Sequence, residues 1–317
     1  MNRSQMNSNQ DARHQDIGPE SVSPGGVSGG FHNLWWLTGR VPPRHRDNLV
    51  VVTEEKHLRR VQDVLNALPA EYAARQALVV MDTPPRTGMS VCLVSVAGEY
   101  VERLDVHPGT RFLPEMLEPL VYPAMTNHVW WACDRAPTTE TLRAVARLAD
   151  QIILDTLTDA PTLVACTLSD LSWERGTPWR ALVARTLDAP EYQVNLPGLE
   201  RAVVRYTAGD ARPARLFAAW LMDRLGWEDA SRVQVIAVHS ERGAGDLDGL
   251  EISGPGFFGF WDGRATDVRV RLTVSGACQD RLLPLIPGSV VDGLAELLSR
   301  PSDSSSQVLR LARSVVT

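Results

Sequence analysis

The sequence has 317 residues, of which 44% are hydrophobic and 22% are charged. This balance is that of ordinary globular proteins and excludes a fibrous or largely disordered chain. The formal net charge of -6 argues against a dedicated nucleic-acid-binding protein, because such proteins neutralise phosphates with clustered Lys and Arg. The length is sufficient for two domains, since single hydrophobic cores stop growing at roughly 250 to 300 residues.

The N-terminal segment, residues 1–30, has few large apolar side chains and contains Pro24-Gly25-Gly26 and Gly29-Gly30. Such a segment cannot bury enough surface to offset the entropy of ordering, so we predict a disordered arm, with order beginning near Phe31. It also lacks an apolar signal region, and no apolar run reaches the roughly 18 residues of a membrane span. The sequence therefore predicts a cytoplasmic protein with no membrane contact.

Residues 31–190 alternate short apolar runs with helical patterns, and Thr138 or Thr139 is a candidate N-cap for one of the helices. The predicted strands are 49–52, 77–81, an extended stretch from 91 to 106, 128–131 and 152–154. The predicted helices are 58–68, 111–121 and 142–148. This alternation predicts an α/β domain, a parallel or mixed sheet with helices on both faces.

A further helix is predicted from Thr177-Pro178, and residues 188–198, with two prolines and a glycine, are the predicted domain boundary. Strands dominate the second half, at 202–206, 233–238, 256–261 and 268–274, with helices from Pro213 to Gly226 and after Ser289. We therefore predict an α+β domain over residues 191–300, followed by a tail over 301–317.

Motifs that carry chemistry are absent from the sequence. There is no P-loop, no GxGxxG after a strand and no GxSxG. The glycine-rich piece from Gly243 to Gly249 contains two aspartates where a phosphate site would need positive charge, so it predicts a hairpin loop. No two histidines have metal-ligand spacing, and Cys92, Cys133, Cys166 and Cys278 are dispersed, which favours a reducing compartment. We predict no catalytic residue, no cofactor and no metal.

Nine tryptophans are present, with adjacent pairs at Trp35-Trp36 and Trp130-Trp131. Neighbours on a strand point to opposite faces, so both residues of a pair belong to the core if both faces are covered. Alternatively one residue of each pair is an exposed anchor, since Trp is enriched among the residues that dominate binding at interfaces. The sequence leaves both interpretations open.

The segments Asp170-Leu171-Ser172-Trp173 and Thr177-Pro178-Trp179-Arg180 resemble the signature of the glucose-6-phosphate dehydrogenase assembly protein family, also called OpcA. Two upstream segments are similar to that family in the same order. They are Arg46 to Val52 and Leu120-Val121-Tyr122-Pro123 followed by His128-Val129-Trp130-Trp131. The resemblance covers roughly residues 45–190 well and the second half by general layout.

The resemblance implies a non-catalytic partner that binds glucose-6-phosphate dehydrogenase, supports its assembly and raises its activity, which feeds the oxidative pentose phosphate pathway and NADPH supply. The surface-connected loop before the helix at Thr177 is the candidate contact. The candidate partner-binding residues are Asp170, Trp173, Trp179, Arg180, Trp130 and Trp131. For Trp179, the apolar stripe of its own helix favours core packing over a role as an exposed anchor, whereas for Trp173 both interpretations are open.

Two other classes of function are weighed against this one. Open α/β sheets bind ligands at the carboxyl ends of their strands, so a sugar-phosphate or nucleotide sensor or enzyme is an alternative. The short basic cluster Arg40, Arg44, His45 and Arg46 raises a nucleic-acid role, which the acidic net charge disfavours.

Overall fold

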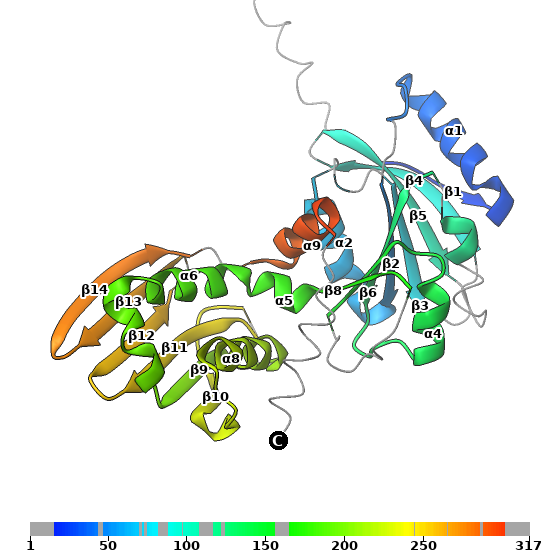
Figure 1. Cartoon of the computed structure of the whole chain (residues 1–317). Coiled ribbons are helices and arrows are strands. Elements are labelled where there is room, and N and C mark those ends of the chain that lie inside the picture. The colour runs from blue at the N-terminus through cyan, green and yellow to red at the C-terminus, as the bar shows by residue number, and fades with distance from the viewer. Residues whose placement is uncertain are drawn as a thin grey trace, which may run out of the picture. The chain divides into compact units, whose positions relative to one another are not determined.

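The computed structural model describes residues 16–301 apart from 44–46, 70–71, 73–74, 82–87, 97, 108–116, 122–123, 156–164, 244, 265 and 286–287. The described residues form two compact units, one made of residues up to Ser169 with those from Ala295, the other of Asp170–Leu294. Each unit contains one mixed β-sheet with helices (Figure 1). No helix in these ranges is long and apolar enough to cross a membrane.

The first unit contains an eight-stranded sheet with the order β1-β4-β5-β3-β2-β6-β7-β8. Its strands are β1 (Ile17–Val22), β2 (Asp47–Glu54), β3 (Arg75–Met81), β4 (Gly88–Val96), β5 (Glu99–His107), β6 (Thr126–Ala132), β7 (Gln151–Leu154) and β8 (Thr167–Asp170). Among the described residues, the helices of this part of the chain are α1 (Val27–Thr38), α2 (Leu58–Ala67) and α4 (Thr139–Val145).

Strand β2 lies at the centre and pairs in parallel with β3 on one side and β6 on the other. Its residues from Leu49 to Val52 are fully buried, because both faces of the strand are covered. The pairs β3 with β5 and β6 with β7 are also parallel. Without β1 and β4, the strands taken in chain order follow the sequence 3-2-1-4-5-6 across the sheet, which is the order of Rossmann-type doubly wound sheets.

Helices α1 and α2 lie on opposite faces of this sheet (Figure 1). Trp35 of α1 donates a hydrogen bond to Glu102 of β5 at 2.8 Å. Arg103, the next residue along β5, donates to Asn66 of α2 at 2.8 Å. Because successive strand residues point to opposite faces, the two bonds place one helix on each side, as the alternation of strands and helices predicts.

The prediction of a disordered arm over residues 1–30 is wrong from Ile17 onward, while residues 1–15 lie outside the described part of the chain. Strand β1 pairs with β4 at the sheet edge, and α1 buries Val27, Phe31, Leu34 and Trp35. The composition of residues 17–30 did not reveal that they are ordered, for two reasons. Main-chain hydrogen bonds stabilise β1, and most of the apolar side chains that hold α1 come after residue 30.

Polar side chains are buried near the amino ends of the parallel strands. Arg103 donates to Gln76 at 2.8 Å, and strand register places His128 and Gln151 on that same face. His128 Nδ1 lies 2.6 Å from Gln151 Oε1, and Gln151 donates to Ser169 at 2.8 Å. A slip of one residue would turn these groups to the other face, so the buried bonds help to fix the register.

The second unit contains a six-stranded sheet with the order β10-β9-β11-β12-β13-β14. Its strands are β9 (Arg201–Thr207), β10 (Val233–Val238), β11 (Leu247–Gly254), β12 (Phe257–Gly263), β13 (Asp267–Val274) and β14 (Ala277–Pro284). Its helices are α5 (Leu171–Arg175), α6 (Thr177–Leu187), α7 (Pro190–Gln193) and α8 (Arg212–Leu225), and α9 (Val290–Ser299) follows the last strand. Only the pair of β9 and β10 is parallel among the strand pairs described for this sheet.

One face of this second sheet packs against helices. Phe217 of α8 meets Trp179 of α6 edge to face at 6.4 Å, and Tyr192 of α7 meets Phe257 of β12 in the same manner at 6.3 Å. The inward strand residues complete the core, namely Ala202, Val204, Leu250, Ile252, Trp261, Val270 and Leu272. Side chains on the opposite face are half-buried or exposed, so we call that side the open face.

The predicted domain boundary at residues 188–198 is corrected by the structure. This segment forms α7 and the 3-10 turn Leu196–Gly198, and Tyr192 is buried and donates to Gln279 at 2.9 Å. The division between the two units falls after Ser169 instead. The prolines that indicated a linker occupy the first turns of the two short helices, where proline loses no hydrogen bond.

Most other predicted elements are confirmed, and β4 with β5 forms a hairpin over the predicted extended stretch. Thr138 caps α4 by accepting from the Thr141 amide, and Ser289 with Asp292 forms the capping box of α9. The predicted hairpin at 243–249 is wrong, because β10 and β11 lie on opposite sides of β9. The predicted helix at 111–121 lies mostly outside the described residues, as does the tail beyond 301.

Substitution at two adjacent glycines of α1 tests how this helix packs. A Cβ at Gly30 would lie 2.7 Å from Val91 Cγ2 and 2.8 Å from Val22 Cγ1, whereas a Cβ at Gly29 would meet nothing within 4 Å. We expect Gly30→Ala to lower the free energy of unfolding by about 1–3 kcal/mol through overpacking. Gly29→Ala should raise it by up to about 1 kcal/mol through helix propensity. Urea unfolding measures both, and equal effects would contradict the close packing of α1 on β4.

Candidate functional site

The predicted partner-binding segment folds around Arg180. Asp170 caps α5 by accepting from the Trp173 amide at 2.7 Å. The Arg180 guanidinium lies 3.6 Å from the centre of the Trp173 ring and donates to the Trp173 carbonyl at 2.6 Å and to Thr177 Oγ1 at 2.7 Å. Burial lowers the pKa of Arg180 to about 10. The guanidinium therefore ties α5 to the first turn of α6.

The structure favours core packing for most of the candidate tryptophans. Trp130, Trp173 and Trp179 are buried, and the half-buried Trp131 donates to the Arg135 carbonyl at 2.7 Å. Of the described tryptophans, Trp36 is the exposed one, with 80% of its surface accessible. A buried indole cannot serve as an anchor without local unfolding, so a role of these residues in partner binding is indirect and stays a prediction.

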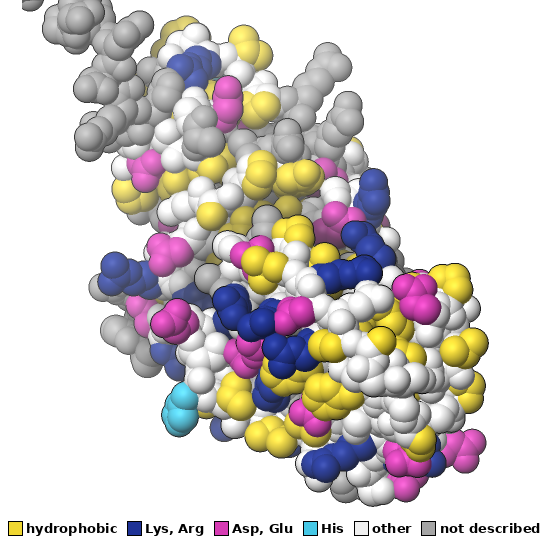
Figure 2. Space-filling model, turned by 90° about the vertical axis from the view of Figure 1, so that its left-hand side faces the viewer, with side chains coloured by type: hydrophobic (Ala, Val, Ile, Leu, Met, Phe, Trp, Pro, Cys, Tyr) yellow, Lys and Arg dark blue, Asp and Glu magenta, His cyan; other side chains and the backbone are white. Residues whose placement is uncertain are grey.

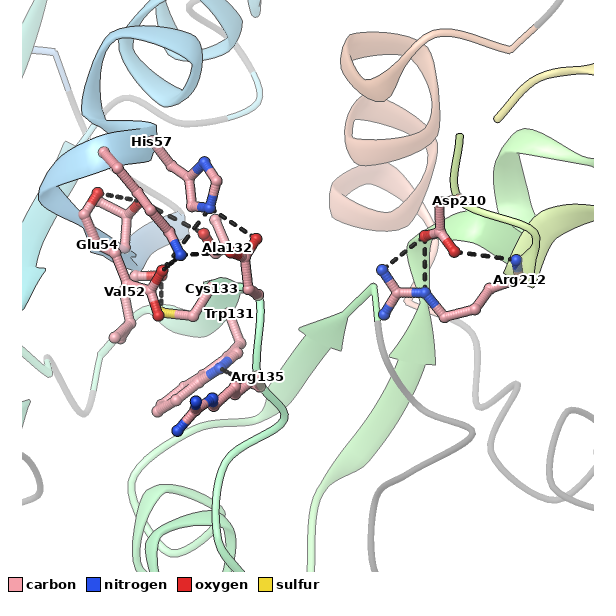
Figure 3. A network of polar contacts seen from close by, with 12 residues as sticks. Val52, Glu54, His57, Trp131, Ala132, Cys133, Arg135, Asp210 and Arg212 are labelled. Carbon is pink, nitrogen blue, oxygen red and sulfur yellow. Dashed lines mark hydrogen bonds and ion pairs between the residues drawn. The ribbon is translucent and has the colours of Figure 1, made fainter. Parts of the chain in front are cut away.

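A polar cluster that sequence reasoning missed lies at the carboxyl ends of β2 and β6. Glu54 ends β2, and Asp134 follows β6 by two residues. Lys56 forms ion pairs with Glu54 at 2.8 Å and with Asp134, and His57 Nε2 lies 2.7 Å from Asp134 Oδ1. Figure 3 shows Glu54 and His57 with the loop after Trp131 in this network.

Hydrogen bonds favour the charged forms of Lys56 and Asp134 in this cluster. Hydrogen bonds to Asp134 and Glu54 raise the pKa of Lys56, and the hydrogen bond from Lys56 lowers the pKa of Asp134. The side chains of Lys56 and Asp134 are 58% and 57% exposed. An exposed ion pair of this kind contributes little to stability, so a change of partner at this position costs little.

The cluster occupies the switch point of the sheet, where an open doubly wound sheet binds its ligand. A dinucleotide would need glycine and free backbone N–H groups in the turn after β2, and this turn reads Glu54-Glu55-Lys56-His57. Carboxylates at this position repel phosphate. The alternative of a nucleotide or sugar-phosphate ligand at this edge stays a prediction.

The open face of the second sheet joins aromatic and charged side chains. Phe258 and Phe260 of β12 stack with ring centres 6.5 Å apart, and the Arg205 guanidinium lies 4.6 Å from the centre of the Phe260 ring. Strand register places Arg271 beside Phe260 and Asp280 beside Arg271. Further residues on this face are Val203, Ile236, Glu251, Asp262, Arg269, Cys278 and Leu282.

Charges on the open face alternate in sign. Arg205 pairs with Asp262 at 3.1 Å, and Asp280 pairs with Arg269 at 2.6 Å and with Arg271 at 3.3 Å. Figure 2 shows basic and acidic side chains lying among hydrophobic ones on the face of the molecule that is turned to the viewer. An apolar centre with arginine and aromatic residues among exchangeable ion pairs is typical of protein interfaces.

The fold and these sites define a Rossmann-like α/β protein whose switch point carries carboxylates and a lysine in place of a phosphate-binding loop. Residues 166–306 match the family OpcA_G6PD_C, described as the C-terminal domain of a glucose-6-phosphate dehydrogenase subunit. This part of the chain is similar to the OpcA family. A protein of Synechococcus elongatus named as the OxPP cycle protein OpcA is 27% identical over 127 residues, which cover 35% of this chain and 28% of that protein. The matched part thus spans little more than a quarter of that relative's length.

Solved structures with a similar fold are oxidoreductases of low sequence identity. A mutant of KijD10, a 3-ketoreductase from Actinomadura kijaniata in complex with TDP-benzene and NADP, is 12% identical, with a TM-score of 0.50 over 85% of this chain and 96% of that chain. The aldose-aldose oxidoreductase from Caulobacter crescentus, complexed with glycerol, is 12% identical with a TM-score of 0.46 over 85% and 96%. At this identity the likeness concerns the fold alone.

Thiol reactivity tests the exposure of the open face. None of the four cysteines forms a disulfide, and burial raises the pKa of Cys92 to about 12, so its reactive thiolate form is scarce at pH 8. Cys278 lies exposed on the open face. We expect Cys278 to react fastest with a disulfide reagent, so Cys278→Ser should remove the fastest phase and Cys92→Ser should keep it. Loss of the fast reaction in Cys92→Ser would contradict this arrangement.

Proposed function

We propose that this chain is a non-catalytic assembly factor and allosteric activator of glucose-6-phosphate dehydrogenase, supporting the oxidative pentose phosphate pathway and NADPH production. The observation that carries the proposal is the family match over residues 166–306, which includes nearly the whole second unit. The name of the Synechococcus elongatus relative points to the same pathway. Activation requires only that the chain binds the active dehydrogenase assembly more tightly than the inactive one.

The two units act as separate domains in this proposal, an α/β domain and an α+β domain. The second domain carries the partner-binding surface, because the matched region contains its entire six-stranded sheet. A cytoplasmic location follows from the partner, which this proposal takes to be a metabolic enzyme of the cytoplasm. No nucleic-acid or membrane partner is part of the proposal.

The open face is the surface that we assign to the dehydrogenase. It offers the stacked pair Phe258 and Phe260 as an apolar centre, with Ile236 and Leu282 exposed by 42% and 59% on the outer strands. Its Arg and Asp side chains pair with one another at low cost, so a partner with charges of both signs can take over these contacts. Two observations support this assignment: the open face combines aromatic and charged side chains, and it lies within the matched residues 166–306.

The segment with Trp173 and Arg180 contributes indirectly in this proposal. Arg180 holds α5 against α6, and Trp179 of α6 packs on Phe217 of α8 beneath the sheet. These contacts keep the covered face rigid, and a rigid sheet presents its open face without the entropy cost of ordering it on binding. Asp170, Trp130 and Trp131 likewise contribute indirectly in this proposal, by stabilising the fold rather than by contacting the partner.

Catalysis by the chain itself is not part of the proposal. The turn after β2 offers no phosphate loop, and its polar groups are paired with one another. The likeness to oxidoreductases concerns the fold alone, so it adds no activity to this chain.

Kinetics with the purified dehydrogenase of the same organism test the proposal. The chain should co-elute with the enzyme and raise its kcat or lower its KM. Phe260→Ala should raise the concentration of chain that gives half-maximal activation at least about tenfold, because truncating a central aromatic anchor costs more than about 1.4 kcal/mol.

The matched control is Trp36→Ala, which removes the exposed indole of the first unit. Activation should be unchanged in this variant, and circular dichroism should be native in both. No co-elution and no kinetic effect of the unaltered chain would refute the activator role. If only Trp36→Ala lost activation, the dehydrogenase-binding surface would have to be assigned to the first unit instead.

A further inference from the structure

Lysine is almost absent from this chain. The sequence has 32 Lys and Arg residues, and Lys56 is the one lysine among them. It stands at the carboxyl end of β2, at the switch point of the first sheet, between the carboxylates of Glu54 and Asp134. A chain that uses arginine at every other basic position therefore places a compact ammonium here, where a planar guanidinium would present a different geometry.

Three side chains around Lys56 are metal ligands by type. Glu54, His57 and Asp134 each offer one donor atom, and these atoms lie within 4.8 Å of one another. His57 Nε2 is 2.7 Å from Asp134 Oδ1 and 3.7 Å from Glu54 Oε2. Two donors bound to zinc at its usual bond lengths are about 3.4 Å apart, so small side-chain movements bring all three donors to one ion.

The surroundings leave room for the remaining ligands of an ion. An open hollow of about 700 Å³ adjoins the cluster and is lined by Glu54, Glu55, Lys56, Asp134 and Arg135. Lys56 is more than half exposed, so its side chain can withdraw into solvent. Water can then complete the coordination, as in zinc sites with three protein ligands.

We propose that Glu54, His57 and Asp134 form a binding site for a divalent transition-metal ion of the zinc class, and that Lys56 is a built-in competitor that occupies this site as an ammonium. One imidazole nitrogen with two carboxylate oxygens suits Zn²⁺ and Co²⁺, whereas Mg²⁺ prefers oxygen ligands alone. The ion would link the carboxyl ends of β2 and β6, the two neighbouring parallel strands that form the switch point of the first sheet. This inference is independent of the proposed function.

Titration of the full chain with Zn²⁺ and with Co²⁺ tests the site. Calorimetry should show one ion bound per chain, and Co²⁺ should give a visible absorption band from its coordination by His57. His57→Ala should weaken binding at least about tenfold and remove the band, since a ligand is lost. Lys56→Met should tighten binding at least about tenfold, because it removes the competing charge while keeping an unbranched side chain of similar length.

Controls separate this site from adventitious binding. His239→Ala, at an exposed histidine of the second unit, should bind Zn²⁺ as the unaltered chain does. Mg²⁺ at the same concentration should give no heat above dilution. Absence of Zn²⁺ binding, equal binding by the unaltered chain and His57→Ala, or unchanged or weaker binding by Lys56→Met would each overturn the proposal, with native circular dichroism required of every variant.

Discussion

Strand β2 is hydrogen-bonded to a parallel strand on each side and covered on both faces. The central position of β2 determines which side chains meet at the carboxyl edge of the first sheet. Because β2 and β6 are in register, with Thr53 opposite Ala132, the chain leaves both strands at the same level. Glu54 and Asp134 consequently come together although 80 residues separate them. Near the amino ends of the two strands, Asn48 of β2 donates a hydrogen bond to Asn127 of β6 at 3.1 Å, which supports the same register.

The second sheet follows a different constraint, since helices cover only one of its faces among the described residues. Alternation along β13 divides Val268, Val270 and Leu272, which are buried, from Arg269 and Arg271, which face outward. A sheet with one covered face is stable in water as long as the other face is sufficiently polar. Here that face also carries a stacked aromatic pair, and in the proposed function this mixture is the surface that the dehydrogenase covers.

Sequence patterns predicted most of the strands and helices, because period-two and helical spacing of apolar residues follow directly from burial. They failed where burial depends on distant partners. Strand β1 is held by pairing with β4, and Tyr192 is buried by Phe257, neither of which local composition reveals. The metal-type cluster was missed because Glu54 and His57 join Asp134 only through the sheet. The presence of a single lysine was the one sequence signal that marked it.

The family resemblance, by contrast, came from short motifs, and the structure shows why they are distinctive. Asp170, Trp173, Thr177 and Arg180 form one connected unit of cap, stacked ring and hydrogen bonds. Such a unit requires these residue types at this spacing, so the motif identifies the fold of the segment. It does not identify the binding surface, because the indoles that the motif contains are buried.

Hydroxyl-radical footprinting of the chain, alone and with glucose-6-phosphate dehydrogenase, is the sharpest test of the proposed binding surface because it reports side-chain exposure residue by residue. We expect oxidation of Phe258, Phe260 and Leu282 to fall several-fold in the presence of the enzyme, while oxidation of Trp36 is unchanged. Equal oxidation of the open face with and without the enzyme, at concentrations where activity is raised, would show that the dehydrogenase binds elsewhere.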